Sequence, residues 1–119
     1  MIKQLINLLF GSPQDQILGT IHQDAYLVDV RNPDEYRSGH ASGSVNIPLS
    51  QIPTSLESFK NKKQIIIVCK SGHRSKMAIS MLSAQGIQNI TNGGGWETVG
   101  RSVAREQSSD YGSIKNDLI

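Results

Sequence analysis

The chain has 119 residues, a formal net charge of +2 and 37% hydrophobic residues, enough for one domain with a modest core. The small net charge gives no reason to expect a nucleic-acid partner. A single cysteine excludes a disulfide framework within the chain and a cysteine-rich zinc site. No apolar run approaches the ~20 residues of a membrane span. We therefore expect no metal, no cofactor and no membrane span, and a reducing cytoplasmic location.

Two helices are predicted before the first strand. Apolar residues recur at helical spacing over residues 2–10, which indicates a short amphipathic helix. Gly11 ends it, and Ser12 is a good N-cap for a second helix that would end near His22. We interpret residues 1–11 as an amphipathic extension that packs on the surface of the domain, rather than as a signal peptide.

The first predicted strand covers residues 25–30, and a short helix follows it. Asn32 is a good N-cap, and Glu35 stands three residues later, as in a capping box. Gly39 stops this helix. A turn and a short strand closed by Pro48 come next.

The central stretch of the chain is predicted to be a helix, a buried strand and a second helix. Residues 52–59 suit a short helix with two apolar side chains facing inward. Residues 65–68 are all β-branched, which suits a strand covered on both faces, and this strand ends at Cys69. A helical pattern then runs from Ser75 to Gly86.

The C-terminal part alternates short elements with polar sequence. Residues 87–91 predict a last short strand, residues 92–95 a flexible glycine loop, and residues 96–99 a short helical turn. Residues 101–119 are polar, and we expect a tail that is partly disordered or a loosely docked helix. We assign residues 12–100 to one domain.

Alternating strands and helices indicate an α/β domain with a mostly parallel sheet. Sites in such sheets form at the carboxyl ends of the strands. Asp29 and Arg31 follow one strand and Cys69 ends another, so we expect them to meet at one edge of the sheet.

Cys69 stands where a strand passes into a helix, and positive charge is concentrated around it. Six of the 12 Lys and Arg residues lie between Lys60 and Lys76, with no acidic residue among them. A helix N-terminus and nearby cations lower the pKa of a thiol and favour small anions. We therefore interpret Cys69 as a nucleophile rather than an inert core residue, with Lys70 and Arg74 at the rim.

The loop also offers hydrogen-bond donors to an anion. Gly72 permits the turn that lets backbone N–H groups converge, and the hydroxyls of Ser71 and Ser75 can donate as well. His73 has two open interpretations, as a solvent-exposed loop residue or as an extra donor and proton source. His40 is interpreted as a residue that shapes the turn after Gly39.

Several motifs, in order, resemble the rhodanese family of sulfurtransferases. The loop Cys69-Lys70-Ser71-Gly72-His73-Arg74-Ser75 is similar to the family's active-site loop. The family's other signature resembles an upstream set of residues, namely Leu27 to Arg31, Glu35-Tyr36, Gly39-His40, Gly43 and Asn46-Ile47-Pro48. Its closing segment resembles Gly93 to Trp96. The resemblance covers about residues 12–99.

This resemblance implies a rhodanese-like α/β fold with a central five-stranded, mostly parallel sheet flanked by helices. It implies a sulfurtransferase in which Cys69 takes sulfur from an anionic donor such as thiosulfate and passes the persulfide sulfur to cyanide or a thiol. The N–H groups from Lys70 to Ser75 would cradle the persulfide, and Lys70 and Arg74 would orient the donor. Asp29 would be structural, and Arg31 would be ion-paired near the site, with Glu35 as a candidate partner.

Loop length bears on the alternatives. Four residues separate Cys69 from Arg74, and cysteine phosphatases of related fold have five, so this loop suits one sulfur atom better than a phosphate. An arsenate-type reductase would need a second cysteine. A further alternative is a sulfur-carrier or regulatory module that hands sulfur to a partner protein without fast turnover.

Overall fold

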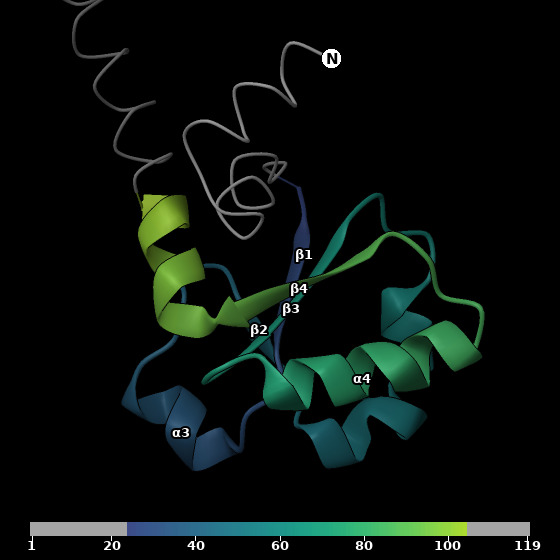
Figure 1. Ribbon diagram of the computed structural model, residues 1–119, viewed down its shortest axis with the longest axis horizontal. Coiled ribbons are helices and arrows are strands. Elements are labelled where there is room, and N and C mark those ends of the chain that lie inside the picture. Colours follow the sequence, from purple (N-terminus) through teal and green to yellow (C-terminus); the bar gives the residue numbers. More distant parts are fainter. Residues whose placement is uncertain (1–23, 105–119) are drawn as a thin grey trace, which may run out of the picture.

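The computed structural model describes residues 24–104, which form a parallel sheet with helices on both faces (Figure 1). The strands are β1 (Tyr26–Asp29), β2 (Val45–Asn46), β3 (Ile65–Cys69) and β4 (Ile90–Gly95). Their order in the sheet is β2-β1-β3-β4, and all neighbouring pairs are parallel. This confirms the α/β class with a parallel sheet.

The expected strand count of five is wrong for the described part of the chain, which contains four strands. The number five came from the family resemblance. Residues 24–104 themselves contain only four β-prone runs, each followed by a turn or a helix, and each of these runs forms one strand.

The helices differ in length from those predicted. The helix α3 (Pro33–Ser38) agrees with its prediction, and its capping contact is present because Asn32 N–H donates to Glu35 Oε1 at 3.2 Å. The predicted helix over residues 52–59 is instead two 3₁₀ helices, η1 (Leu49–Thr54) and η2 (Leu56–Phe59). Pro53 lies inside η1 and has no N–H to donate, which disfavours a continuous α-helix there.

The strand β4 lies further along the chain than predicted, since it includes the glycines expected to form a loop. A β-carbon on Gly93 would come within 2.8 Å of Val68 Cγ1, so this glycine permits close packing of β4 on β3. The register shifts between Ile67 and Val68, opposite this part of β4. Close packing, rather than flexibility, explains the glycine run.

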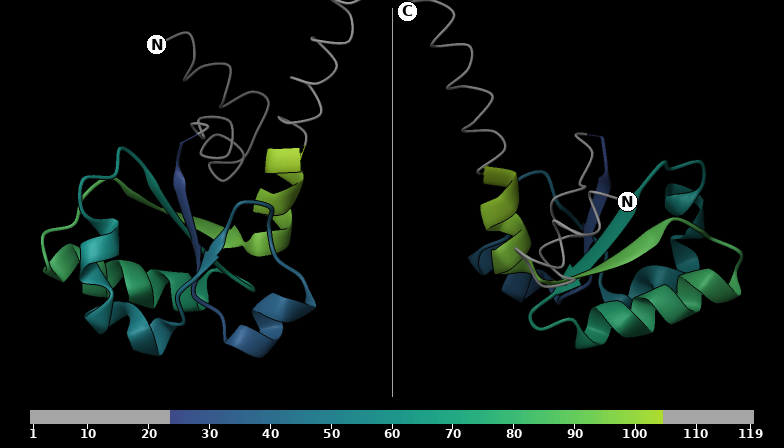
Figure 2. Two further views of the ribbon diagram at one scale, coloured as in Figure 1. Left: turned by 180° about the vertical axis from the view of Figure 1, so that it is seen from behind. Right: turned by 45° about the horizontal axis from the view of Figure 1, so that its top comes forward.

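The two remaining helices lie on opposite faces of the sheet (Figure 2). The helix α4 (His73–Ala84) begins two residues earlier than predicted. A further helix starts at residue 96 and includes residue 104, so it is longer than the predicted turn and passes residue 100. Val99 and Val103 pack one helical turn apart on the sheet, which explains the extra length. No helix within residues 24–104 has the length and apolarity that crossing a membrane requires.

The predicted helices over residues 2–10 and up to His22, and most of the predicted tail, lie outside the described residues. The division of the chain at residues 12 and 100 therefore stays a prediction.

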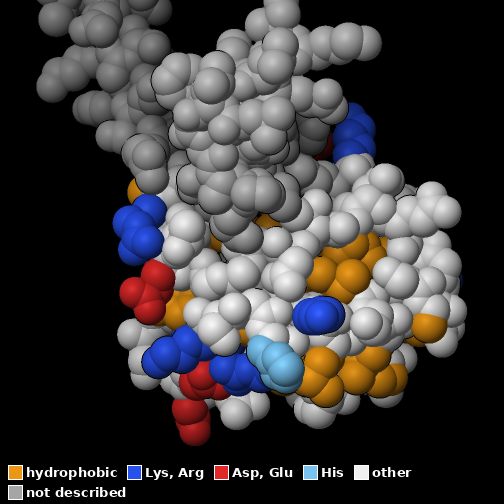
Figure 3. Space-filling view, viewed as in Figure 1, with side chains coloured by type: hydrophobic (Ala, Val, Ile, Leu, Met, Phe, Trp, Pro, Cys, Tyr) orange, Lys and Arg blue, Asp and Glu red, His pale blue; other side chains and the backbone are white. Residues whose placement is uncertain are grey.

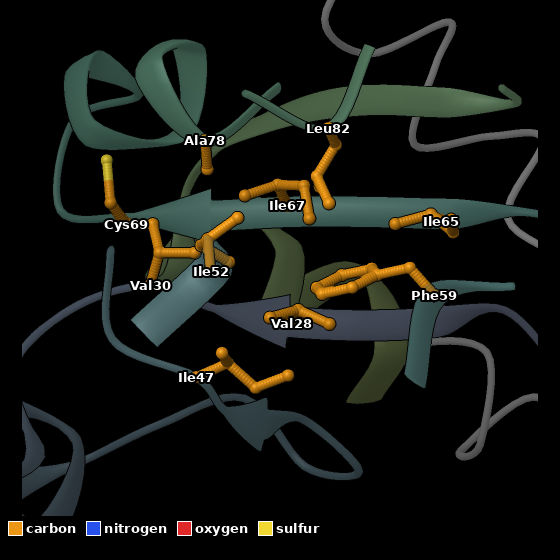
Figure 4. Close-up of a cluster of buried hydrophobic side chains, with 10 residues drawn as sticks. All are labelled: Val28, Val30, Ile47, Ile52, Phe59, Ile65, Ile67, Cys69, Ala78 and Leu82. Carbon is orange, nitrogen blue, oxygen red and sulfur yellow. The ribbon is translucent and has the colours of Figure 1, made fainter. Parts of the chain in front are cut away.

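Side chains alternate between two apolar clusters, one on each face of the sheet. The larger cluster lies under α4 and the 3₁₀ helices, as Figure 4 shows. Its members are Val28, Val30, Ile47, Ile52, Phe59, Ile65, Ile67, Cys69, Ala78 and Leu82. Cys69 is the last of these along β3, and its sulfur points from the core toward the loop that leads into α4 (Figure 4). The core therefore holds the backbone of Cys69 in place, and its sulfur lies at the edge of the sheet.

Candidate active site

The loop between β3 and α4 wraps around the sulfur of Cys69. Cys69 is 1% exposed, and the N–H of Gly72 donates to its Sγ at 2.9 Å. Gly72 has φ +95°, a left-handed conformation that side chains rarely adopt, and a β-carbon there would lie 3.3 Å from Gly94 Cα. The glycine is therefore needed both for the turn and for the close approach to β4.

The surroundings of the sulfur lower the pKa of the Cys69 thiol. Burial acts in the opposite direction and raises the pKa. Hydrogen bonding from the Ser75 hydroxyl and from the N–H groups of Ser75, Ser71 and Gly72 outweighs this effect. The site thus favours negative charge on the sulfur, as expected for a nucleophilic cysteine.

Ser75 has a buried hydroxyl aimed at this part of the loop. The residue is 0% exposed, and its Oγ has no partner of good hydrogen-bond geometry within residues 24–104. The hydroxyl nevertheless lies close enough to the sulfur to lower its pKa. A buried donor without a partner is costly, and a negatively charged sulfur would satisfy it.

Asn92 on β4 supports the loop from below, and the sequence analysis did not single it out. Its Nδ2 donates to the carbonyl of Gly72 at 3.1 Å, and its Oδ1 accepts from Gly94 N–H at 2.9 Å. The sequence did hold a signal for this role, because Asn92 is a polar residue that stands between a predicted strand and three glycines. Through this contact β4 fixes the turn that presents the Gly72 N–H to the sulfur.

Arg74 lies at the rim of the loop and is paired with Glu35 of α3. Two hydrogen bonds, of 2.6 and 3.0 Å, join the guanidinium to the carboxylate, and the side chains are 31% and 33% exposed. The hydrogen bonds from Arg74, together with the Asn32 N–H, lower the pKa of Glu35 to about 2, although burial opposes the shift. The suggested pairing of Glu35 with Arg31 is therefore wrong, because Arg74 occupies the carboxylate.

Arg31 and Asp29 form a buried pair next to the rim. Arg31 Nε and Nη2 donate to Asp29 Oδ2 at 3.0 and 2.7 Å, and both side chains are almost fully buried. Arg31 also donates to the carbonyls of Gly39 and Glu35, and its guanidinium lies 4.6 Å from the ring centroid of Trp96. Arg31 thus connects the end of β1, both ends of the α3 segment and the helix that starts at residue 96.

The other predicted rim residues are exposed. The side chains of Lys70, Ser71 and His73 make no hydrogen bond or ion pair within the described part of the chain. Figure 3 shows basic and acidic side chains next to one another along one edge of this face, beside a histidine. His40 stacks on Tyr36 at 3.8 Å between ring centroids and donates to its carbonyl, in agreement with a role in the turn. Residues 24–104 contain no cluster of histidine, cysteine or acidic side chains suited to a metal ion.

A parallel sheet flanked by helices, with a cysteine at the end of a central strand and a loop that leads from it into a helix, defines a class of small α/β domains. The sequence model of the family described as "Rhodanese-like domain" matches residues 13–100. The chain therefore belongs to the rhodanese-like domain family, as the sequence motifs predicted.

Relatives with known names support this family at moderate identity. The chain is 31% identical over 70 residues to a "Sulfurtransferase" of Allochromatium vinosum, which covers 59% of this chain and 65% of that protein. It is 32% identical over 78 residues to the "Putative sulfurtransferase YtwF" of Bacillus subtilis (63% and 76%). It is 35% identical over 66 residues to the "Putative sulfur carrier protein YrkF" of Bacillus subtilis. That match covers 56% of this chain but only 36% of YrkF.

Solved structures agree on the fold. A "rhodanese with anions from E. coli" superposes with a TM-score of 0.56 at 29% identity and covers 61% of this chain and 88% of that one. A rhodanese-like domain protein from Staphylococcus aureus superposes with a TM-score of 0.60 at 31% identity and covers 69% and 82%.

Proposed function

We propose that the protein is a sulfurtransferase that moves sulfane sulfur from a small anionic donor such as thiosulfate to a thiophilic acceptor through a persulfide on Cys69. The observation that carries the proposal is the loop itself. It places one N–H at 2.9 Å from the sulfur, and nearby it places a buried serine hydroxyl that has no partner of good geometry within residues 24–104; four residues separate Cys69 from Arg74.

In the donor step, the Cys69 thiolate attacks the outer sulfur of thiosulfate. The new S–S bond forms on Sγ, the S–S bond of thiosulfate breaks, and its electron pair leaves with sulfite. The outer sulfur then carries the negative charge in the region of the Gly72 N–H and the Ser75 hydroxyl. Lys70, exposed and without an ion-pair partner within residues 24–104, attracts the anionic donor, and Arg74 adds to the local field together with Glu35.

In the acceptor step, cyanide or a thiolate attacks the outer sulfur. The bond between the two sulfurs breaks, its electron pair returns to Sγ, and thiocyanate or a new persulfide leaves. No metal or cofactor takes part in either step. A single nucleophilic thiol without a disulfide partner suits a reducing compartment, so we place this activity in the cytoplasm.

The experiment is an intact mass measurement after incubation with thiosulfate and removal of the excess. The proposal predicts the gain of one sulfur atom, its loss on addition of cyanide, and no gain in Cys69→Ser. Retention of no sulfur, combined with hydrolysis of an aryl phosphate, would assign the site to a phosphatase instead. Reduction of arsenate by the single-cysteine chain would favour the reductase.

A second candidate is a sulfur carrier that hands sulfur to a partner protein without fast turnover, and the similarity to YrkF motivates it. Both functions predict the same persulfide, so the mass measurement does not separate them. Steady-state turnover with thiosulfate and cyanide does. An enzyme turns over many times without a partner, whereas a carrier releases its sulfur at a rate that depends on the partner's concentration.

A further inference from the structure

A cavity of about 300 Å³ lies beside the active-site loop, between α3 and the helix that starts at residue 96. Glu35, Lys70, Trp96 and Glu97 are among the residues that line it. Its volume is at the low end of the range for small-molecule sites, so it suits a ligand no larger than a short peptide. Lys70 directly follows Cys69 in the chain, so this Trp96 cavity lies next to the active-site loop.

The charges around the Trp96 cavity are of two kinds. Arg31, in its wall, is neutralised by Asp29, and Glu35 is neutralised by Arg74. Lys70 and Glu97 are exposed and have no ion-pair partner within residues 24–104. Among the described residues, the cavity lining therefore presents one unpaired positive group, one unpaired negative group and the indole ring of Trp96.

These charges discriminate between ligands. An inorganic anion would be attracted by Lys70 but repelled by Glu97. A simple cation would be attracted by Glu97 but repelled by Lys70. A molecule that carries both a carboxylate and an ammonium group can pair with both side chains at once. We propose that the Trp96 cavity binds the sulfur acceptor and that this acceptor is a small amino-acid thiol, its carboxylate facing Lys70 and its ammonium facing Glu97. This inference rests on the proposed function of Cys69.

The transfer step balances without a further reactant. The bound thiol loses its proton to solvent, and its thiolate attacks the outer sulfur of the Cys69 persulfide. A bond forms between the acceptor sulfur and the outer sulfur, and the bond to Sγ breaks. Its electron pair stays on Cys69, and the acceptor leaves as a persulfide.

Trp96 is the only tryptophan of the chain, so its fluorescence reports ligand binding in the cavity. The probe is S-methyl-L-cysteine, which keeps both charges but has no thiol, so the measurement does not depend on sulfur transfer. Its N-acetyl derivative lacks the ammonium, and its methyl ester lacks the carboxylate. At fixed ionic strength we expect saturable binding of the probe, with each derivative roughly two- to fivefold weaker, the effect of one exposed ion pair.

Two variants test whether the charges of Glu97 and Lys70 cause the preference for the doubly charged probe. Glu97→Gln should remove the preference for the probe over its N-acetyl derivative, and Lys70→Gln the preference over its methyl ester. Glu57→Gln and Lys63→Gln make the same charge changes at exposed positions outside the cavity and should retain both preferences. Equal binding of the three compounds, or an unchanged preference in Glu97→Gln, would overturn the assigned ligand class.

The acceptor role is tested by discharging protein loaded with sulfur from polysulfide. For each thiol, the discharge rate of Glu97→Gln is divided by that of wild type. This ratio should be lower with L-cysteine than with N-acetylcysteine. Each ratio compares one thiol with two proteins, so the intrinsic reactivity of the thiol cancels. Equal ratios would overturn the acceptor assignment. A protein that accepts no sulfur at all would overturn the proposed function, and the fluorescence preference would then stand by itself.

Discussion

Arg74 and Glu35 are 39 positions apart in the chain, yet two hydrogen bonds of 2.6 and 3.0 Å join their side chains at the rim of the Cys69 loop. The pair connects the first turn of α4 to α3. The electrostatic field at the sulfur therefore depends on both charges. Removal of the arginine makes this field more negative, and removal of the glutamate makes it more positive.

Arg74→Ala and Glu35→Gln should change the KM for thiosulfate in opposite directions. Arg74→Ala leaves an unpaired carboxylate near the sulfur, so we expect the KM for an anionic donor to rise roughly two- to fivefold. Glu35→Gln leaves an unpaired guanidinium, so the KM should fall. Steady-state kinetics at two ionic strengths measures both, and the effects should shrink at high salt.

The same two variants test whether Arg74 serves the substrate or the fold. Its side chain is partly exposed, so Arg74→Ala should change the thermal unfolding temperature little. A large drop in that temperature with an unchanged KM would assign Arg74 to structure. A KM that rises in both variants would mean that the geometry of the pair, rather than its charge balance, matters.

Glu35 should also give the protein a specific acid dependence of stability. Its pKa is about 2 in the folded protein, against an ordinary value of 4.5, so on acidification the unfolded chain takes up the proton first. The stabilisation is fully present above about pH 4.5 and is lost as the pH falls toward 2. The difference in free energy of unfolding between wild type and Glu35→Gln should therefore shrink over that window. Urea unfolding measured between pH 6 and 2 checks this, and Arg74→Ala, which removes the partner, should show a weaker pH dependence.

Ser75→Ala should raise the pKa of the Cys69 thiol without destabilising the fold. The Ser75 hydroxyl lowers that pKa, so its removal should shift the midpoint of the pH dependence of iodoacetamide alkylation upward. The same hydroxyl is buried without a partner of good geometry in the described chain, so its loss should leave the unfolding temperature unchanged or higher. Ser80→Ala is the matched control, because its Oγ is exposed on the same helix and donates to the Lys76 carbonyl. An unchanged alkylation midpoint in Ser75→Ala would show that the hydroxyl does not lower the pKa of the Cys69 thiol.

Two glycine substitutions should have opposite effects on stability. A β-carbon at Gly93 would meet Val68 Cγ1 at 2.8 Å and Ile66 Cγ2 at 2.9 Å in the core, so Gly93→Ala should cost about 1–3 kcal/mol in the free energy of unfolding. At Gly100 the nearest atoms, of Ala41, are 3.5 Å away and the backbone is helical. Gly100→Ala should therefore be neutral or stabilise the protein by up to about 1 kcal/mol. Equal costs at both positions, measured by urea unfolding, would contradict the packing explanation of β4.

Local sequence patterns predicted elements whose causes are themselves local. Asn32 and Glu35 lie three positions apart, so the start of α3 could be predicted from the capping pattern, and the structure has this contact. Residues 65–68 form a fully buried strand because every side chain in the run is β-branched and apolar. The glycines after Asn92 were misassigned because the same residue type suits a flexible loop and a tightly packed strand, and only the neighbouring strand distinguishes these.

The sequence by itself determined the class of protein and proposed its nucleophile, because the order of strands and helices and the spacing from Cys69 to Arg74 are properties of the chain. Only the tertiary structure decided the partners of the charged residues. Glu35 pairs with Arg74 rather than Arg31, Asn92 supports the Gly72 turn, and Lys70 and Glu97 meet around one cavity. These contacts join residues from different elements, and they exist only because the packed sheet brings the ends of β1, β3 and β4 to one edge.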